Sequence, residues 1–408
     1  MKDEKKKIAI VSNTLLLNGA TKSLLDLLSR IDKNLCDIDL YVLSKKGDVY
    51  WEQKIPQNVR IIEMPTYQKD WNILKIQLMN YPIHFFKAVL AGRNLKKNIK
   101  KIKYMKYTAR RMPKIHKKYD IAISYRHHDI DVFYVKENIQ AKKKYFWIHG
   151  IQSFDENEKK YLRKVYSSYN GAFSVSIAAK ENILRIFPEL KDKIKVAYSV
   201  VDDNEIKQLS AKGEKLVKNK NVCNIVTVSR LSYEKGIHIA VEACKLVKDR
   251  GYNVKWYIIG DGPERKELEK MVNEYNLNGI VIFLGEMKNP YGFMGTCDIY
   301  VQPSLMEGYG LTINEAKILN SVIVCSNIPA AQEQIENGKN GFLVDVSADK
   351  FAGMIINLID NKSLVEKVKK NLMLEENSHF EAVKIFNELR VGHADIFLDR
   401  YAYTPSII

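Results

Sequence analysis

The stretch PSLMEGYGLTINE, from Pro303 to Glu315, decides the fold of this 408-residue chain. It follows the apolar run Asp298–Val301, which is typical of a buried strand, and it leads into the helical pattern Leu311–Leu319. A strand, a glycine-containing turn and a helix in this order predict a parallel α/β sheet whose binding residues lie just after its strands. The turn itself contains Glu307, Gly308, Tyr309 and Gly310.

The start of this predicted helix is suited to binding an anion. Its first backbone amides have no partner within the helix, and the helix dipole adds partial positive charge, so a phosphate fits there. Glu315, about one turn into the helix, can accept hydrogen bonds from ribose hydroxyls, and Glu307 can meet sugar hydroxyls. The alternative makes Glu315 a first-turn acid favoured by the dipole and Glu307 an ordinary turn residue, but the complete string after a strand favours a site.

Two further motifs follow strand patterns upstream. Arg230 and Lys235 bracket a strand-to-helix turn, where a planar fork and a point charge could hold a diphosphate. Two surface cations without a role would look the same. Gly260 belongs to the turn Gly260–Pro263, which is either a plain tight turn or a ligand loop, and Asp261 is a candidate cap for a helix beginning near Pro263.

Short apolar runs alternate with helical patterns throughout the chain and restart near residue 222, which predicts two doubly wound Rossmann-like domains facing a central cleft. We expect an N-terminal acceptor-binding domain at 1–205 and a C-terminal nucleotide-sugar-binding domain at 206–385. We also expect a C-terminal tail at 386–408 that returns to the first domain. The polar stretch Lys207–Asn221 is the linker candidate.

The net charge of +17 is unevenly placed, because residues 71–119 contain no Asp or Glu. Interleaved basic and apolar residues predict amphipathic helices, and an anionic membrane surface attracts each Lys or Arg by about 1 kcal/mol. A solvated charged face and nucleic-acid binding are the alternatives, the latter without a matching motif. No leader and no membrane-spanning run is evident, so we expect a cytoplasmic protein, peripheral at the inner face of the membrane. The five cysteines fit buried residues in a reducing compartment.

Taken together, Arg230, Lys235, the Gly260–Pro263 turn and the Glu307/Glu315 pair resemble the retaining glycosyltransferases of family 4, which have the GT-B fold and include enzymes of bacterial surface-polysaccharide assembly. The resemblance implies that Arg230 and Lys235 hold the donor diphosphate and that Glu307 binds the donor sugar. It also implies that Glu315 holds the ribose. Backbone amides around Gly308, Tyr309, Gly310, Leu311 and Thr312 would contact sugar and phosphate. In the first half, Gly19 would let a loop approach the donor, and His149 would lie near the sugar.

The resemblance further implies transfer of a hexose or related sugar from a nucleotide-diphosphate sugar, with UDP-sugar favoured, to a lipid-linked or other saccharide acceptor. No cofactor, no metal and no nucleic acid are expected. A non-catalytic GT-B partner subunit is the alternative, because Asn320-Ser321 and Ala330-Ala331 stand where the family commonly has glycines. The sequence after Glu388 also departs from the usual closing helix. His127, His128 and Asp129 form either a metal site, an acceptor contact or an exposed loop.

Overall fold

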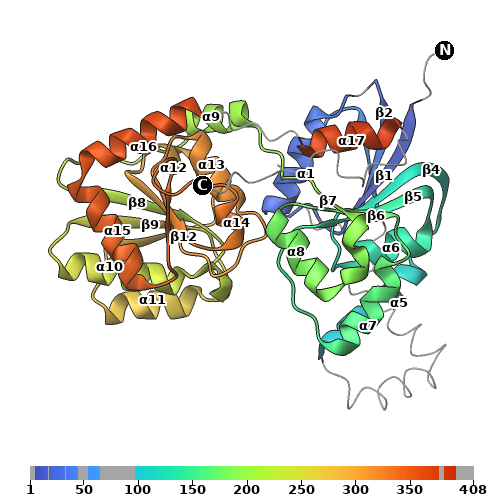
Figure 1. Ribbon diagram of the computed structural model, residues 1–408, viewed down its shortest axis with the longest axis horizontal. Helices are drawn as coiled ribbons and strands as arrows, with labels where there is room; N and C mark the ends of the chain where they lie inside the picture. The colour runs from blue at the N-terminus through green and yellow to red at the C-terminus, as the bar shows by residue number, and fades with distance from the viewer. Residues whose placement is uncertain are drawn as a thin grey trace. The chain divides into compact units, whose positions relative to one another are not determined.

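The protein is described by a computed structural model that covers residues 5–16, 18–32, 34–44, 54–64, 97–375 and 381–391 (Figure 1). The chain forms two compact units. The first runs to Tyr198 and takes in helix α17 (Glu381–Val391), and the second is Ser199–His379. Within the described ranges, no helix has both the length and the apolar character needed to span a membrane.

The first unit contains a seven-stranded parallel sheet in the order β3-β2-β1-β4-β5-β6-β7. Its strands are β1 (Lys6–Ser12), β2 (Cys36–Val42), β3 (Val59–Glu63), β4 (Ile115–Ser124), β5 (Ile139–Ile148), β6 (Gly171–Ser174) and β7 (Ile194–Val196). The helices are α1 (Gly19–Arg30), α5 (Lys97–Arg111), α6 (Ile130–Asn138), α7 (Glu156–Tyr166) and α8 (Ile177–Ile186), with a 3-10 turn η2 (Pro188–Lys193).

The later residues of the central strands β1, β4 and β5 are mostly apolar and buried, as in a parallel sheet covered by helices. Ala9, Val11, Ala122, Phe146 and Ile148 are buried in one core. The last described helix, α17, packs with this unit, far in sequence from its neighbours (Figure 1). Its Glu388 side chain accepts a hydrogen bond from Lys195 at 3.0 Å, so residues within the expected tail 386–408 reach the first unit.

The second unit contains a six-stranded parallel sheet in the order β10-β9-β8-β11-β12-β13. Its strands are β8 (Cys223–Val228), β9 (Val254–Ile259), β10 (Val281–Gly285), β11 (Ile299–Gln302), β12 (Ile323–Ser326) and β13 (Phe342–Val344). Its helical elements are α9 (Asp203–Lys212), η3 (Tyr233–Lys235), α10 (Ile237–Asp249), α11 (Arg265–Glu274), α12 (Tyr291–Thr296), α13 (Leu311–Ile318), α14 (Pro329–Gln332), α15 (Ala348–Asp360) and α16 (Lys362–Leu374).

Alternating residues of these strands build two cores, one on each face of the sheet. Val301 and Ile258 pack with α10, α11 and α15, whereas the adjacent Tyr300 and Ile259 pack with α9, α12 and α13. This period of two is what a strand buried on both sides requires. The expectation of two doubly wound parallel α/β sheets is therefore confirmed.

One local expectation changes, and another is covered only in part. The stretch Lys207–Asn221 is not a linker throughout, because residues up to Lys212 complete helix α9, which packs against α12 and α13. Of the basic segment 71–119, residues 71–96 lie outside the described residues. The remainder forms α5 and the first half of β4.

Candidate functional site

The loop between β11 and α13 holds a carboxylate that has three side-chain partners. The Glu307 carboxylate accepts hydrogen bonds at Oε1 from Ser304 Oγ (2.8 Å) and Gln302 Nε2 (3.1 Å). At Oε2 it pairs with Lys235 Nζ at 2.7 Å. Only 8% of the Glu307 side chain is exposed, against 23% for Lys235, so this is a partly buried, hydrogen-bonded ion pair.

The turn that carries Lys235 is attached to the same loop through its backbone. The amides of Leu305 and Met306 donate to the carbonyl of Glu234 at 2.9 and 3.3 Å. Gly236 has a φ of 64°, and a Cβ there would lie 2.0 Å from the Pro303 carbonyl oxygen. Only glycine allows both the left-handed backbone and this close approach. The cation and the carboxylate are thus brought together by backbone packing.

Helix α13 begins next to this pair. Its N-cap is Gly310, with a φ of 87°, and no side chain caps the helix. Uncapped first-turn amides at a helix start can bind an anion. The Thr312 hydroxyl, in this first turn, donates to Gln302 Oε1 at 3.3 Å, which joins the helix start to the Glu307 group.

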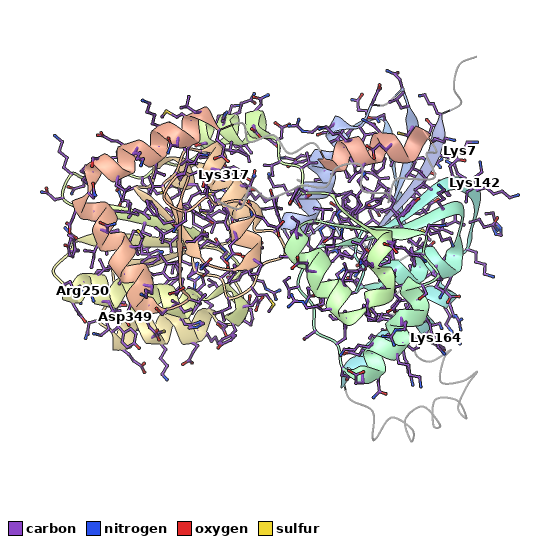
Figure 2. The ribbon with its side chains drawn as sticks, in the orientation of Figure 1. Lys7, Lys142, Lys164, Arg250, Lys317 and Asp349 are labelled. Atoms are coloured by element: carbon purple, nitrogen blue, oxygen red, sulfur yellow. The ribbon has the colours of Figure 1, made fainter. Side chains whose placement is uncertain are left out.

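Glu315 and the turn before α13 are fixed from behind. Glu315 is buried and accepts a hydrogen bond from the Tyr291 hydroxyl at 3.0 Å. The Gln334 amide donates to the backbone carbonyl of Tyr309, and the buried Lys317 donates to the Gln334 carbonyl at 3.1 Å. Lys317 is labelled in Figure 2, among the side chains of the second unit. The glycine turn is therefore held at a defined position by neighbouring elements.

Packing accounts for the Gly260–Pro263 turn. A Cβ at Gly260 would lie 2.0 Å from Ser229 O, and one at Gly262 would lie 2.2 Å from Leu231 O. The Leu231 amide donates to Asp261 O at 3.0 Å, so the turn supports the loop that carries the exposed Arg230. Asp261 does not cap α11, because its carboxylate accepts from the Gly262 amide at 2.7 Å and the helix begins only at Arg265.

The two expected site residues of the first unit lie on separate elements of that unit. Gly19 is the first residue of α1, after an Asn18 cap whose side chain accepts from Thr21 N at 3.0 Å, so it belongs to a helix start rather than to a free loop. His149 follows β5 and packs on Tyr125, with ring centroids 4.6 Å apart. Burial, with Arg126 and His128 nearby, lowers the pKa of His149 to about 3, so the ring is neutral.

A buried polar group next to His149 was not anticipated in this form. His127 is fully buried, which contradicts an exposed loop at that position, whereas His128 is exposed. Asp129 caps α6 and accepts from Asn13 Nδ2 at 3.1 Å. Asp131 is also fully buried, and burial together with Asp129 raises its pKa well above the usual value. Among the described residues, no group of three or more His, Cys, Asp or Glu side chains is placed to hold a metal ion.

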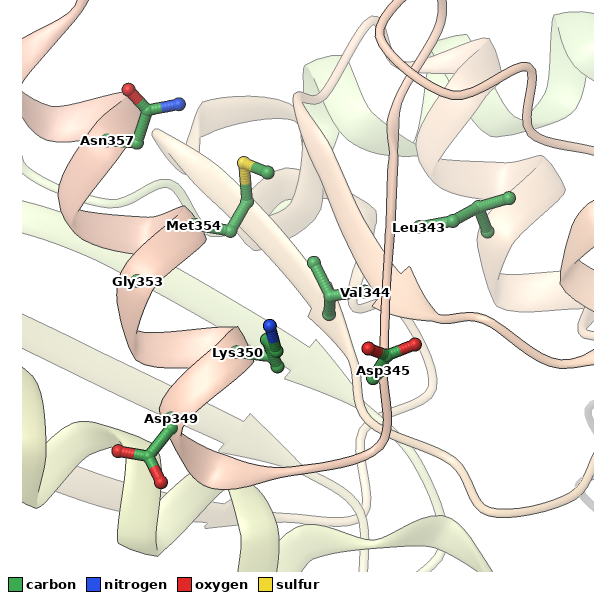
Figure 3. Close-up of a pocket in the computed structure, with 8 residues that line it drawn as sticks. All are labelled: Leu343, Val344, Asp345, Asp349, Lys350, Gly353, Met354 and Asn357. Atoms are coloured by element: carbon green, nitrogen blue, oxygen red, sulfur yellow. The ribbon is translucent and has the colours of Figure 1, made fainter.

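Gln302, Ser304, Tyr291 and Gln334 are the supporting residues that the sequence did not single out. Gln302 carried a usable signal, since it is a polar residue at the end of an apolar strand. A shallow pocket elsewhere in the second unit lies between β13 and α15, and none of these four residues lines it (Figure 3). It is lined by Leu343, Val344, Asp345, Asp349, Lys350, Gly353, Met354 and Asn357.

Comparison with known proteins finds a family match within the second unit. Residues 208–373 match the family described as "Glycosyl transferases group 1". A segment of 195 residues is 29% identical to "Capsular polysaccharide biosynthesis glycosyltransferase CapM" of Staphylococcus aureus, covering 46% of this chain and 49% of that protein. A segment of 208 residues is 28% identical to "N-acetylgalactosamine-N,N'-diacetylbacillosaminyl-diphospho-undecaprenol 4-alpha-N-acetylgalactosaminyltransferase" of Campylobacter jejuni, covering 50% of this chain and 54% of that protein.

The chain thus spans about half the length of the curated relatives it matches. Among solved structures, it resembles Anabaena Alr3699/HepE in complex with UDP and glucose, with a TM-score of 0.68 and 18% identity over 96% of this chain and 100% of that one. This likeness concerns the fold, and it confirms the expected GT-B class.

Proposed function

We propose, because residues 208–373 match the family described as group 1 glycosyl transferases, that the chain is a retaining glycosyltransferase of surface-polysaccharide assembly (capsule, exopolysaccharide or lipopolysaccharide). It moves a hexose or related sugar from a nucleotide-diphosphate sugar to a lipid-linked saccharide acceptor. The observation that carries the proposal is the Lys235–Glu307 pair beside the uncapped start of α13. It unites a cation, a carboxylate and helix amides, which are groups suited to a diphosphate sugar.

Each group has a distinct role on the donor. Lys235 and Arg230 bind the diphosphate, and the amides at Gly310–Thr312 add neutral donors to its oxygens. Glu307 binds hydroxyls of the sugar, and Glu315 binds the ribose. Gly308 and Tyr309 lend backbone contacts, and Gly260 acts through the support it gives to the Arg230 loop. His149 and Gly19, on the first unit, contact the sugar and the donor.

The chemistry follows from the charge that develops. Breaking the bond between sugar and diphosphate places negative charge on the departing phosphate and positive charge on the sugar ring. Lys235, Arg230 and the helix amides stabilise the former by preorganised electrostatics. The acceptor hydroxyl attacks the face from which the diphosphate leaves, which retains the configuration. UDP-sugar is the proposed donor, supported by the UDP complex of the Anabaena neighbour, and no cofactor or metal is assigned a role.

A membrane surface is the proposed location of the acceptor. The name of the Campylobacter relative includes a diphospho-undecaprenol, a lipid-linked group. Helix α5 buries Ile102, Met105 and Ala109, contains no acidic residue, and exposes Tyr104 and Tyr107 among its basic side chains. Such a helix suits peripheral contact with the anionic inner face of the cell membrane.

Nucleoside diphosphate release from UDP-, GDP- and ADP-sugars, with a membrane lipid extract as acceptor, tests the proposal. We expect release from one donor, and its loss by at least about 100-fold in Glu307→Ala. Glu336→Ala, which removes an exposed carboxylate paired with Lys339, is the matched control and should retain the rate. Donor binding without any release favours the alternative, a non-catalytic partner subunit. Absence of donor binding would exclude the assigned donor site.

A further inference from the structure

Gln302, the last residue of β11, lies behind Glu307 and is 2% exposed. We propose that Gln302 is a positioning residue that orients the Glu307 carboxylate toward the donor sugar, and that Tyr300 fixes the orientation of Gln302. The inference rests on the proposed function, because it assigns Glu307 to the sugar. It adds a specific residue, a second contributor and a direction of hydrogen bonding to that site.

The direction of the hydrogen bonds follows from chemistry. An ionised carboxylate only accepts, so the Gln302 group 3.1 Å from Glu307 Oε1 must be its NH₂. The same NH₂ donates to Ser304 Oγ at 2.9 Å, and the Ser304 hydroxyl donates onward to Glu307 Oε1. Gln302 Oε1 therefore faces the other way and must be met by donors.

Two hydroxyls meet that oxygen. Tyr300 OH lies 2.8 Å from Gln302 Oε1, and Thr312 Oγ1 lies 3.3 Å from it. Burial raises the pKa of Tyr300, so it keeps its proton for donation. Its other acceptor, the Val228 carbonyl, is at 3.5 Å. The proton of Tyr300 therefore points at Gln302. A flipped Gln302 amide would place its NH₂ against the Tyr300 hydroxyl proton and its oxygen against the Glu307 carboxylate.

This arrangement separates two tasks at one carboxylate. Gln302 and Ser304 hold Oε1 with neutral donors, while Lys235 holds Oε2 with a charge. Lys235 can therefore turn toward a donor phosphate while Glu307 keeps its place. A carboxylate held by Lys235 alone would be released at the moment the phosphate arrives.

The test compares Gln302→Leu, which keeps the approximate size and removes the amide, with Tyr300→Phe, which removes only the orienting hydroxyl group. Thr227→Val is the matched control, since Thr227 is a buried residue of β8 that donates to Val301 O and accepts from Trp256 Nε1. We expect kcat for transfer to fall about 30- to 100-fold in Gln302→Leu and about 5- to 10-fold in Tyr300→Phe. UDP affinity by calorimetry and KM for the donor should stay within about threefold in both, and all parameters within about twofold in Thr227→Val.

Crystal structures of the two variants give a readout independent of activity. We expect Glu307 Oε1 to leave Ser304, or the carboxylate to rotate, in Gln302→Leu. Unchanged kcat relative to Thr227→Val, or a Glu307 that keeps its place in both variants, overturns the inference. If the wild type turns over no donor, the proposed function fails, and the position of Glu307 in the variants alone decides this inference. If Gln302→Leu does not fold, Tyr300→Phe decides it by the same measurements.

Discussion

At the scale of single residues, we expect the Lys235–Glu307 pair to contribute to stability as well as to catalysis. Lys235→Met leaves a mostly buried carboxylate without its cation, so we expect about 1–3 kcal/mol loss in unfolding free energy and at least about 100-fold slower transfer. Adding Glu307→Gln removes the stranded charge, so the double variant should regain stability but not activity. Denaturant unfolding and product release measure the two separately.

The opposite pattern would contradict the pair. If the double variant is less stable than either single variant, the carboxylate does not depend on Lys235. If Lys235→Met transfers sugar at the wild-type rate, the diphosphate is held elsewhere. Lys245→Met, which breaks an exposed helical pair with Asp249, is the control and should change unfolding by no more than about 0.5 kcal/mol.

His149 predicts a dependence of stability on pH. Its pKa is about 3 in the folded protein and ordinarily 6.5, so the unfolded chain binds more protons between these values. Stability should therefore fall as pH drops below about 6.5, with this residue contributing a slope of up to about 1.4 kcal/mol per pH unit. Burial is the main cause of the lowered pKa, and Arg126 and His128 nearby lower it further, while Tyr125 and Trp147 pack against the ring.

Unfolding free energies of the wild type and His149→Gln, measured from pH 7 to pH 4, check this. In the variant, the slope of unfolding free energy against pH should be smaller by roughly the contribution of one proton. Part of the acid sensitivity remains, because burial also lowers the pKa of His127. Parallel curves for the two proteins would mean that His149 is protonated in the folded state. Transfer rates should show no ionisation of His149 between pH 5 and pH 8.

Sequence and structure differ in an instructive way at this scale. Lys235, Glu307 and Glu315 are candidates because of their positions after strands, since loop residues at strand ends are where α/β sheets bind ligands. Gln302 was missed although it is a polar residue at the end of an apolar strand, because its role depends on contacts such as Glu307 Oε1 at 3.1 Å, which the sequence pattern does not show. His127 was misjudged for the same reason, since its burial comes from neighbouring elements.

At the scale of elements, the turn after β9 supports the loop after β8. Gly262→Ala would place a Cβ 2.2 Å from the Leu231 carbonyl oxygen, which is backbone and cannot swing aside. We expect about 1–3 kcal/mol lower unfolding free energy and weaker diphosphate binding, because Arg230 shifts with its loop. Chemical denaturation and UDP titration provide the measurements.

Gly353→Ala is the matched control, because it lies in the exposed face of α15 with nothing within 4 Å of the added Cβ. Helix propensity predicts a gain of up to about 1 kcal/mol in unfolding free energy there. Equal changes in unfolding free energy for Gly262→Ala and Gly353→Ala would mean that the turn accommodates the added Cβ without strain.

The boundaries of the elements could not all be predicted from residue spacing, since α9 occupies part of a polar stretch that composition alone marked as a linker.

At the scale of the whole molecule, the alternation of strands and helices was sufficient to predict both sheets. Apolar runs with a period of two, separated by amphipathic helices, have few solutions other than a covered parallel sheet. The return of α17 to the first unit depends on contacts such as Lys195–Glu388, whose partners are 193 positions apart. Such a pairing is a property of the packed chain and has no local pattern.

The net charge of +17 favours binding of the intact protein to anionic membranes. Lys103, Arg111 and Lys114 are exposed on α5 and the segment that follows it. Replacing all three by Gln should weaken binding to vesicles containing phosphatidylserine by about 3 kcal/mol, or about 100-fold, because each charge near an anionic surface is worth about 1 kcal/mol. Vesicle co-sedimentation at fixed salt measures this.

The control makes the same charge change in the second unit, at the exposed Lys215, Lys218 and Lys220. If charge alone governed attraction, both triple variants would lose affinity equally, whereas a docking surface on α5 makes the first loss much larger. Raising salt should weaken wild-type binding and narrow the difference, since screening acts on exposed charges. Tighter binding to duplex DNA than to vesicles at equal salt would overturn the membrane assignment and turn attention to nucleic acid as the partner of the basic segment.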